Sequence, residues 1–383
     1  MTTIRNGSET NVPADNKPKL LIIEGDGIGP EVIREARRVV AWFADNRKLA
    51  FDISESRLGV RAYHDLGTML PDETVRAAEA ADAVLFGAIG GDGYEDIPME
   101  VRRESGLLAL RRKLGLFANL RPAIALDALL DASSLKPEVV RGVDLLIVRE
   151  LSSGIYFGEP RGIEDLGTGE RRGFNTMTYT SGEIRRVGRL SFELARGRRN
   201  QLCSIEKSNV LETSKLWREE MRELHKNEFP DVEFNELIVD AAAMQIIRDP
   251  RQFDVIVTSN LFGDILSDAA AMLTGSLGML PSASLSEADA GGRRNAFYEP
   301  VHGAAPDIAG KDLANPLATF LSFAMALRYS FDAAGDAGLL ERAVTETVAR
   351  GVRTADIKGE VTQAVSTTEM GSAVLDSLNR LAE

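Results

Sequence analysis

The sequence predicts an α/β protein whose strands are buried and largely parallel. Short aliphatic runs recur along the chain, and amphipathic, helix-like segments fall between most of them. Strands that helices cover on both faces have near-continuous apolar sequences of this kind. The runs are LLII from Leu20, AVLF from Ala83, VDLLIV from Val143, ELIV from Glu236 and DVIV from Asp254.

The first run leads into GDGIGPE, residues 25–31, which we interpret as a tight strand-to-helix turn bordering a cleft. Pro30 suits the first turn of a helix. The motif superficially resembles a dinucleotide fingerprint, but its third glycine comes one residue too early, and no acidic residue ends a second strand ~20 residues later. We therefore do not predict a Rossmann-type nucleotide site.

The composition predicts a soluble protein that needs no disulfide bonds. The chain has 383 residues, enough for two domains or one large one. Its 58 acidic and 45 basic residues give a net charge of −13, which argues against a nucleic-acid partner. The single Cys203 fits a reducing compartment, so we expect the cytoplasm. His64, His225 and His302 lie far apart, which argues against a zinc site.

No segment predicts secretion or membrane insertion. Residues 1–19 are polar and lack the apolar core of a signal peptide, so we expect a mobile leader. The longest apolar stretch, residues 316–327, is interrupted by Thr319 and Ser322. It is much shorter than the ~20 residues of a membrane span.

Residues 155–184 form a long segment rich in glycine and charge, without a clear helical period. Such a segment is usually either functional or disordered. Its TMTYT portion, residues 176–180, has strand propensity. We therefore predict either an extended arm that pairs with another segment or a flexible loop.

Asp264 and Asp268 stand four residues apart in VTSNLFGDILSDAAAM, so a helix would place them on one face with Leu261, Ile265 and Met272. Like charges at this spacing repel, more strongly where apolar neighbours draw them inwards. A positive group is therefore expected between them. Two carboxylates suit Mg²⁺ or Mn²⁺, with water or substrate as further ligands. The alternative is a solvated acidic face.

A second helical face is predicted from Glu104, Leu107, Leu108 and Arg111, which are spaced i, i+3, i+4 and i+7. It would join an aliphatic patch to a guanidinium, as a ligand with a branched hydrocarbon group and a carboxylate requires. An ordinary amphipathic helix with an arginine reaching into solvent is the alternative.

Two further arginines lie where their charge must find an anion. Arg121 falls in an extended apolar stretch, and Arg149 ends a buried strand. A guanidinium stays charged and binds a carboxylate through two hydrogen bonds. Together with Arg111 these residues predict a dicarboxylate site, although each alone is more often structural.

Tyr156 and Lys207 are the candidate proton carriers. Lys207 follows the strand QLCSIE at the expected start of a helix, where a lysine can be desolvated. Packing of Tyr156 and solvation of Lys207 are the alternatives. Asp240 ends NELIVD; we interpret it as a helix N-cap, with a third metal ligand as the alternative.

Residues 298–316, YEPVHGAAPDIAGKDLANP, form a loop rich in proline and glycine that suits a nucleotide contact. Asn315 and Pro316 predict the start of the next helix. Asp307 can accept hydrogen bonds from ribose hydroxyls and repel a 2′-phosphate, which would favour NAD over NADP. A structural turn is the alternative.

Together these segments resemble the β-decarboxylating dehydrogenases, which include isocitrate and isopropylmalate dehydrogenases. The resemblance covers the chain from about Leu20 to Leu378. It lies in nine segments in the family order: GDGIGPEV, ADAVLFGAIGG, ESGLLALRRKLGLFANLRPA, VRELSSGIYFGEPRG, EKSNVLETSKLWR, VDAAAMQII, SNLFGDILSDAAAMLTGSLGMLPSASL, EPVHGAAPDIAGKDLANP, and TADI with STTEMG.

The resemblance implies a non-Rossmann, two-domain fold of the isopropylmalate/isocitrate dehydrogenase type. Residues 1–116 and 275–383 would form the larger, NAD-binding domain. Residues 117–274 would form the second domain, with the metal ligands, the arm and the dimer interface. Family members are homodimers, often with clasped arms, and residues 155–184 would be such an arm.

The resemblance also implies roles for individual residues. The substrate carboxylates would be held by Arg111, Arg121 and Arg149. Mg²⁺ or Mn²⁺ would be held by Asp264, Asp268 and the partner's Asp240. As hydride leaves for NAD⁺, Lys207 would take the hydroxyl proton, and after CO₂ loss Tyr156 would protonate the enol carbon. The NAD-binding loop would contribute His302, Gly303, Ala305, Asp307, Ile308 and Asn315.

Shared active sites are a further implication. Lys207, Asn209, Val210 and Asp240 would enter the active site of the other subunit, so a monomer would be inactive. In the isopropylmalate branch of the family, the isopropyl group is accepted by residues that match Glu104, Leu107, Leu108 and the partner's Val210.

The implied reaction is NAD-dependent oxidative decarboxylation of 3-isopropylmalate to 4-methyl-2-oxopentanoate and CO₂, in leucine biosynthesis. A methyl group or two discriminates by only ~1–3 kcal/mol, so the same chemistry on D-malate, tartrate or another 3-alkylmalate is the alternative. An alternative from another class is a non-catalytic relative that binds a dicarboxylate or NAD.

The chain departs from the family pattern in three places. Glu24 replaces the proline usual before GDGIGP, and Glu206 stands where aspartate is common. GGDGYEDIPMEVRRE, from Gly90, replaces the commoner GGPKW form. This last change alters the approach to Glu104, so it bears on substrate preference rather than on reaction type.

Overall fold

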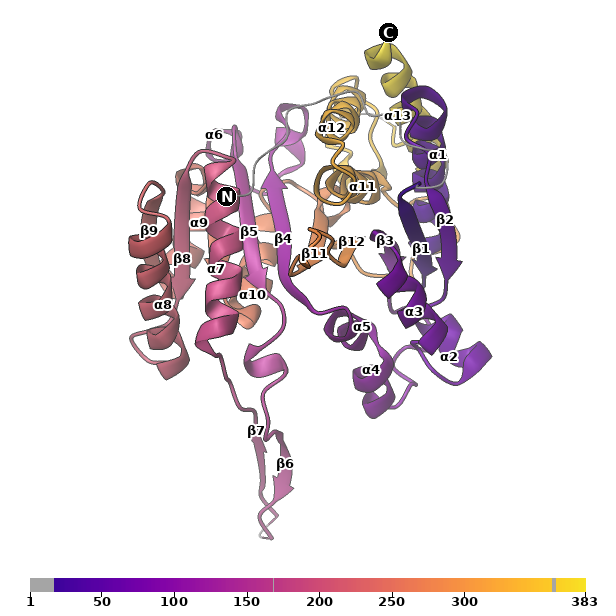
Figure 1. Ribbon diagram of the computed structural model, residues 1–383. Helices are drawn as coiled ribbons and strands as arrows, with labels where there is room; N and C mark the ends of the chain where they lie inside the picture. Colours follow the sequence, from indigo (N-terminus) through magenta and orange to yellow (C-terminus); the bar gives the residue numbers. More distant parts are fainter. Residues whose placement is uncertain (1–16, 168, 360–362) are drawn as a thin grey trace.

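The computed structural model describes residues 17–167, 169–359 and 363–383. One ten-stranded sheet runs through the molecule in the order β2-β1-β3-β12-β11-β4-β5-β10-β8-β9 (Figure 1). Its strands are β1 (Lys19–Gly25), β2 (Asp52–Ser56), β3 (Ala83–Ala88), β4 (Leu116–Ile124), β5 (Asp144–Glu150), β8 (Gln201–Glu206), β9 (Glu233–Ile238), β10 (Val255–Thr258), β11 (Pro281–Ser286) and β12 (Ala296–Pro300).

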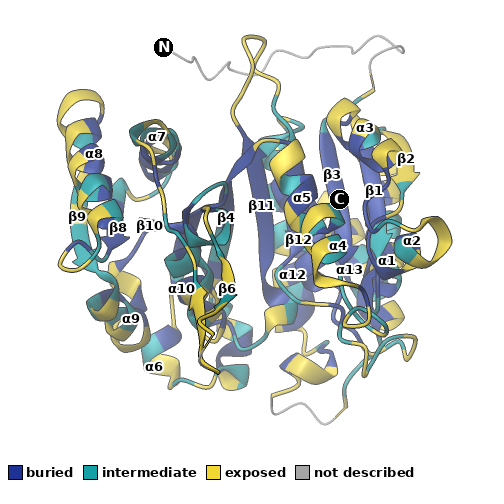
Figure 2. Ribbon diagram, turned by 90° about the horizontal axis from the view of Figure 1, so that it is seen from below, coloured by how far each residue is buried: buried dark blue, intermediate teal, exposed yellow. Residues whose placement is uncertain are grey.

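Helices cover both faces of this sheet, whose central strands are the most deeply buried (Figure 2). The helices are α1 (Gly29–Arg47), α2 (Val60–Leu66), α3 (Asp72–Ala80), α4 (Met99–Ser105), α5 (Leu107–Lys113), α6 (Pro137–Val140), α7 (Ser181–Arg196), α8 (Glu212–Glu228), α9 (Val239–Arg248), α10 (Asn260–Ala271), α11 (Leu317–Tyr329), α12 (Ala334–Ala349) and α13 (Thr367–Ala382). Short 3₁₀ helices are η1 (Asp127–Ala132), η2 (Gly154–Tyr156), η3 (Pro250–Gln252), η4 (Leu277–Met279) and η5 (Ala355–Ile357).

The predicted α/β class is confirmed, and the aliphatic runs lie in β1, β3, β5, β9 and β10. Most neighbouring strands pair in parallel, as predicted. The centre differs, because β12, β11, β4 and β5 pair with one another antiparallel. As a result, the strands on the two sides of the centre run in opposite directions. Short apolar runs carry no information on strand direction, so the sequence did not predict this reversal.

The predicted boundaries between domains fall at the two places where the chain crosses the centre of the sheet. Residue 116 begins β4, and residue 274 lies between α10 and β11. β4 and β11 pair with each other, so the sheet continues across both boundaries. The division into two domains therefore stays a prediction.

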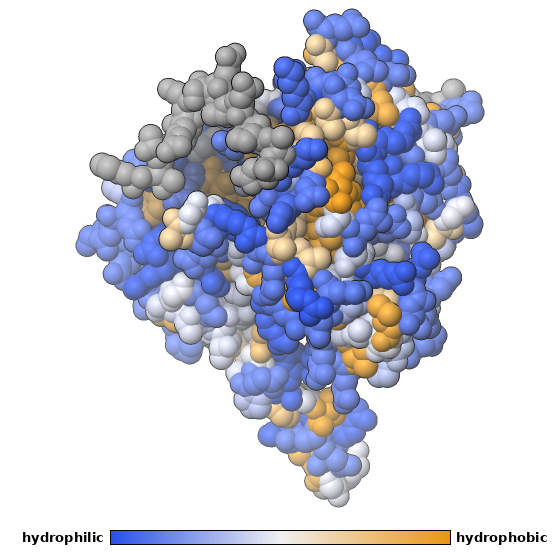
Figure 3. Space-filling model, turned by 45° about the vertical axis from the view of Figure 1, so that its right-hand side comes forward, coloured by the Kyte–Doolittle hydropathy of each residue, from blue (hydrophilic) through white to orange (hydrophobic). Residues whose placement is uncertain are grey.

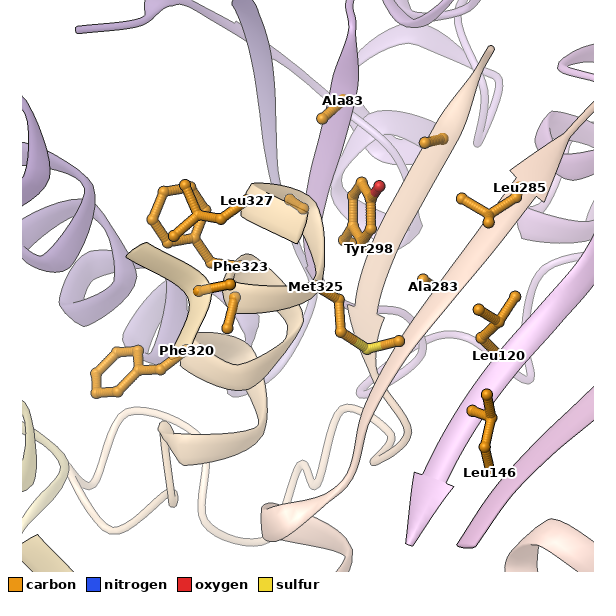
Figure 4. Close-up of a cluster of buried hydrophobic side chains, with 14 of the residues drawn as sticks. Ala83, Leu120, Leu146, Ala283, Leu285, Tyr298, Phe320, Phe323, Met325 and Leu327 are labelled. Atoms are coloured by element: carbon orange, nitrogen blue, oxygen red, sulfur yellow. The ribbon is translucent and has the colours of Figure 1, made fainter. Parts of the chain in front are cut away.

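The hydrophobic core is continuous on one face of the sheet and divided on the other. On the first face, α11 packs Met325 towards the sheet, where the buried side chains come from both sides of the centre and include Tyr298, Leu120 and Leu146 (Figure 4). On the opposite face, one cluster lies under α3 and α5, and a separate one under α9 and α10. Between these two clusters the central strands carry polar side chains, and this gap positions the candidate site.

The turn after β1 has the tight geometry that was predicted, and its glycines make room for neighbouring backbone. At Gly27, where φ is +56°, a Cβ atom would lie 2.1 Å from the carbonyl oxygen of Ala304. The next residue, Ile28, donates its N–H to that same carbonyl at 2.8 Å. α1 begins at Gly29, with Pro30 in its first turn. The turn is thus docked against the loop that contains His302.

The segment from 155 to 184 contains a hairpin of β6 (Gly162–Asp165) and β7 (Arg171–Phe174), which projects from the body (Figure 1). Within the single chain, residues 176–180 form no strand, and the predicted pairing of this portion with another segment stays a prediction. Thr180 instead caps α7 in a reciprocal capping box with Glu183. Thr180 thus belongs to the N-terminus of α7 and not to a strand.

Two predictions concern the periphery of the chain. Residues 1–16 of the predicted leader lie outside the described residues, whereas Lys19 already belongs to β1. Among the helices of the described residues, none is long and apolar enough to cross a membrane.

Candidate active site

The acidic pair on α10 has the arrangement that its spacing predicts, and an arginine lies between the two carboxylates. Arg121, on β4, places Nη1 3.0 Å from Asp268 Oδ1 and Nη2 3.6 Å from Asp264 Oδ1. Asn119 and Ser267 accept hydrogen bonds from the same guanidinium, each at 2.7 Å. The expected positive group is therefore a side chain of the same chain.

Arg149 joins this cluster from the end of β5. The residue is 3% exposed, and its Nη1 forms an ion pair with Asp264. Burial, followed by the charge of Arg121, lowers the pKa of Arg149 to about 10, which leaves it charged at neutral pH. Two guanidinium groups thus converge on one carboxylate, an arrangement suited to binding a second anion between them.

Tyr156, in η2, lies against the same aspartate. Its hydroxyl donates to Asp264 Oδ2 at 2.8 Å, and its ring lies 5.6 Å from the guanidinium carbon of Arg149. Burial and the hydrogen bond to Asp264 raise the pKa of Tyr156 above its usual value. The hydroxyl is therefore protonated at neutral pH and available as a proton donor.

Arg111, on α5, forms an ion pair with Glu299 of β12. Both side chains line a cleft of about 170 Å³ together with Arg121. Leu107 and His302 lie on the same cleft, so it connects the arginines with the predicted NAD-binding loop.

The single helical face predicted for Glu104, Leu107, Leu108 and Arg111 is wrong, because the helix breaks at Gly106. Gly106 is extended, and a Cβ atom there would lie 2.3 Å from the carbonyl oxygen of Arg102. Glu104 therefore lies in the last turn of α4, while the other three residues belong to α5. Leu107 lines the small cleft, and Leu108 lines a larger cavity of about 750 Å³ together with Tyr156.

Lys207, Asn209, Val210 and Asp240 form a separate group. Lys207, after β8, forms an ion pair with Asp240 in the first turn of α9. The N-cap of α9 is Ile238, so the interpretation of Asp240 as the N-cap is wrong. Asn209 is exposed, as is Val210 at 64%. Within the described part of one chain, no group of three or more His, Cys, Asp or Glu side chains is placed to hold a metal ion.

The loop before α11 contains His302, Gly303, Ala305, Asp307, Ile308 and Asn315. The His302 Nε2 atom is buried and has no hydrogen-bond partner among the described residues, and burial lowers the pKa of this imidazole. Asp307 is exposed. Asn315 accepts from the N–H of Leu317 and donates to Asp356 Oδ2, each at 3.0 Å. The predicted helix start is thus correct to within one residue, since Pro316 is the N-cap.

Sequence reasoning missed several polar residues on the central strands. Asn119, Ser282, Ser284 and Glu299 lie in the gap between the two clusters of the divided core, while their neighbours in sequence face the continuous core. The signal was present as alternation of polar and apolar residues in ANLRP and PSASLS, whereas in AFYEP it is a single charged residue in an otherwise apolar run. It was missed because β11 and β12 were not identified as strands.

The chain matches known proteins over nearly its whole length. The family described as isocitrate/isopropylmalate dehydrogenase matches residues 19–374. Proteins named 3-isopropylmalate dehydrogenase from Paramagnetospirillum magneticum and Cereibacter sphaeroides are 60% and 59% identical to it. The matches cover 95% and 94% of this chain and 98% of each relative.

Solved structures agree with these matches. The fold is similar to isocitrate dehydrogenase from Methylococcus capsulatus, with a TM-score of 0.81, 33% identity and coverage of 94% of this chain and 99% of that one. For a β-decarboxylating dehydrogenase from Thermococcus kodakarensis, the TM-score is 0.73 at 32% identity, with coverage of 95% and 96%. The chain therefore belongs to the isocitrate/isopropylmalate dehydrogenase family.

Proposed function

We propose that this dehydrogenase catalyses the NAD-dependent oxidative decarboxylation of 3-isopropylmalate in leucine biosynthesis, in the cytoplasm. The observation that carries the proposal is the convergence of Arg121, Arg149 and Tyr156 on Asp264, beside a cleft that Leu107 lines. The names and high identity of the bacterial relatives support this substrate. The buried, lone Cys203 fits the compartment.

The substrate carboxylates are proposed to bind Arg111, Arg121 and Arg149. Each of these guanidinium groups is already oriented by a protein carboxylate, namely Glu299, Asp268 or Asp264. A substrate carboxylate would share or replace those contacts. Burial strengthens the interaction because the cleft excludes most of the competing water.

Asp264 and Asp268, with Asp240 of the partner subunit, are proposed to hold Mg²⁺ or Mn²⁺. The donor set fits such a cation, since carboxylate oxygens are hard ligands and Mg²⁺ is often bound by one or two of them plus substrate. Asp268 and Asp240 are mostly exposed and therefore accessible from outside the chain. The bound metal would supply positive charge where negative charge develops on substrate oxygen.

NAD is proposed to bind along the loop of residues 302–315. The unpartnered Nε2 atom of His302 and the exposed carboxylate of Asp307 offer hydrogen-bonding groups to a ribose or a base. In the reaction NAD⁺ would accept the hydride. We propose that residues 1–116 and 275–383 form the domain that carries this loop, and that residues 117–274 form the second domain.

Two side chains are proposed to move protons. Lys207 of the partner subunit would take the proton of the substrate hydroxyl as the hydride leaves. Tyr156 would donate its hydroxyl proton to the carbon that loses CO₂. The raised pKa of Tyr156 supports this role, because the group is protonated at neutral pH before the transfer.

The protein is proposed to act as a homodimer with shared active sites. α9 and α10 pack side by side and leave large apolar side chains exposed, among them Met244 at 64%, Ile247 at 53% and Ile265 at 59%. The arm carries Ile163 at 69% exposure and projects from a mostly hydrophilic surface (Figure 3). Pairing of two copies would cover both regions and bring Lys207 and Asp240 to the other subunit's site.

The double substitution Met244→Glu with Ile247→Glu is expected to produce a monomer that has lost activity by at least ~100-fold, because the charges cannot be buried between subunits. Light scattering after size-exclusion chromatography measures the mass, and NADH formation measures turnover. Ile53→Glu, on the outer strand β2 and 45% exposed, is the matched control and should leave both unchanged. A fully active dimer carrying the double substitution would contradict the proposed interface.

For the wild-type protein with NAD⁺ and Mg²⁺, kcat/KM for 3-isopropylmalate is expected to exceed that for D-malate by at least ~100-fold, because an apolar pocket gains with each carbon it buries. Leu107→Ala should reduce this ratio, since Leu107 lines the cleft beside the arginines. A preference for D-malate would contradict the proposed substrate, although the reaction would still be an oxidative decarboxylation.

A further inference from the structure

Asn260 is a fully buried residue at the start of α10, and the proposed mechanism assigns it no role. Its Oδ1 atom accepts two hydrogen bonds from Arg149, from Nε at 3.0 Å and from Nη2 at 2.8 Å. Its Nδ2 donates to the carbonyl oxygen of Ser153 at 3.0 Å. The donors of Arg149 and the acceptor on Ser153 together allow only this orientation of the amide.

The two bonds occupy one edge of the guanidinium and leave Nη1 to face Asp264, a carboxylate that is partly exposed. Nε and Nη2 form the lateral fork, which carboxylates often occupy in proteins. Here a neutral amide oxygen fills that fork, while Nη1 contacts Asp264. The guanidinium is therefore fixed in place without a second full negative charge, which preserves its attraction for a substrate carboxylate.

The remaining contacts of Arg149 restrict it from other directions. At Gly263, a Cβ atom would lie 2.6 Å from Cγ of Arg149, so α10 lies directly against the arginine stem. The ring of Tyr156 lies 5.6 Å from the guanidinium carbon. A displacement of Arg149 would therefore also disturb the environment of the proposed proton donor.

The backbone of Asn260 is itself fixed by a hydrogen bond. Its backbone N–H donates to the hydroxyl of Tyr179 at 2.9 Å, and Tyr179 is 7% exposed. Burial and the neighbouring Glu150 raise the pKa of Tyr179, so its hydroxyl stays protonated. Gly154 allows this approach, since a Cβ atom there would lie 2.5 Å from that hydroxyl.

We propose that Asn260 is a positioning residue that holds Arg149 for a substrate carboxylate while leaving its charge available. This inference rests on the proposed function, because it assigns Arg149 to substrate binding. Beyond that assignment, Asn260 acts through its two hydrogen bonds to Arg149 and not by contact with the substrate. Its neutral amide fills the lateral fork where a carboxylate would neutralise the guanidinium.

Two substitutions separate position from charge. Asn260→Ala removes the acceptor, and Asn260→Asp keeps an acceptor but adds a negative charge and repels the carbonyl of Ser153. Both are expected to raise KM for 3-isopropylmalate by ~10-fold or more, because misplacing or neutralising a binding group weakens substrate capture. KM for NAD⁺ should change less than ~2-fold, since Asn260 bonds to Arg149, Ser153 and Tyr179, which lie outside the loop of residues 302–315. Asn235→Ala and Asn235→Asp, on the exposed part of β9, are the matched controls.

Folding and binding are measured alongside turnover. Thermal unfolding checks that each variant is folded, and calorimetry measures 3-isopropylmalate binding with Mg²⁺ in the absence of NAD⁺. Tyr179→Phe, a nearly isosteric change that removes the acceptor behind Asn260 together with the hydroxyl's interaction with the buried Glu150, should raise KM for 3-isopropylmalate by ~3-fold. A folded Tyr179→Phe protein with wild-type KM would contradict the proposal even if the Asn260 variants do not fold.

A double-mutant cycle tests whether Asn260 acts through Arg149. In an Arg149→Gln background, Asn260→Ala should change KM for 3-isopropylmalate by less than ~2-fold, because the group that it positions is gone. Independent, multiplicative effects would overturn the proposal. Absence of wild-type turnover would contradict the proposed function, whereas normal wild-type turnover with unchanged KM in folded Asn260→Ala would contradict only the positioning role.

Discussion

The Asp264→Asn protein is expected to lose at least ~10³-fold in kcat/KM, because one carboxylate serves several groups of the site. Asp264 pairs with Arg149, lies 3.6 Å from Arg121 and accepts the hydroxyl hydrogen bond of Tyr156. Asparagine has the same shape but cannot supply the charge. NADH formation over a range of Mg²⁺ or Mn²⁺ concentrations measures the loss, and Mn²⁺ binding followed by electron paramagnetic resonance measures the ligand role directly.

The fold should survive this change, since Asp268 still pairs with Arg121 and the side chain of Asp264 is 32% exposed. Asp231→Asn, which removes a fully exposed carboxylate paired with Arg196, is the matched control and should keep wild-type activity. Wild-type turnover or undiminished Mn²⁺ affinity in the Asp264→Asn protein would refute its role as a metal ligand.

Mixing two inactive proteins, Lys207→Ala and Arg121→Ala, is expected to restore activity once their subunits exchange. In a mixed dimer, one site combines intact Arg121 from one chain with intact Lys207 from the other. The second site carries both substitutions. Random reassociation makes half of the dimers mixed, so the recovered activity should approach about a quarter of the wild-type value. NADH formation after mild dissociation and reassociation measures the recovery.

The control uses substitutions of two residues that, in the proposed dimer, the same subunit contributes to each active site. Arg121 and Asp268 contact each other at 3.0 Å. Mixing Arg121→Ala with Asp268→Asn therefore creates no intact site and should restore nothing. Mass spectrometry of intact dimers verifies the exchange. Lack of rescue for the Lys207 and Arg121 pair despite verified exchange would contradict shared sites.

The sequence was most informative about features that depend on residues close to one another in the chain. The aliphatic runs predicted the strands, and the spacing of Asp264 and Asp268 predicted their common helical face. Repulsion between them also predicted a positive neighbour. It did not identify Arg121 as that neighbour, because the contact joins positions 147 residues apart and depends on how β4 and α10 pack.

One prediction failed where a local pattern competed with a specific backbone feature. The spacing from Glu104 to Arg111 suits one helix, yet Gly106 takes an extended conformation that separates Glu104 from the rest. Of residues 176–180, Thr180 serves as the N-cap of α7 in a capping box with Glu183. Periodicity describes which residues share a face only if the element is unbroken.

Asn260 shows a third limit of sequence reasoning. Nothing in SNLFGDILSD distinguishes it from an ordinary residue at a helix start. Its partners are Arg149, Ser153 and Tyr179, which come from three other parts of the chain. A buried amide that bonds through both its oxygen and its nitrogen becomes recognisable only once those segments are placed together.

The antiparallel pairing of β4 with β11 has a mechanical consequence. Among the described residues, the chain passes between the two sides of the sheet near these strands, so a twist of one side against the other would centre on this pair. Atoms on a rotation axis move least. Arg121, on β4, would lie close to the rotation axis. Arg111 and the loop after β12 lie farther from it and would move more. A small twist at the centre would therefore change the width of the cleft, while the guanidinium of Arg121 stays almost still.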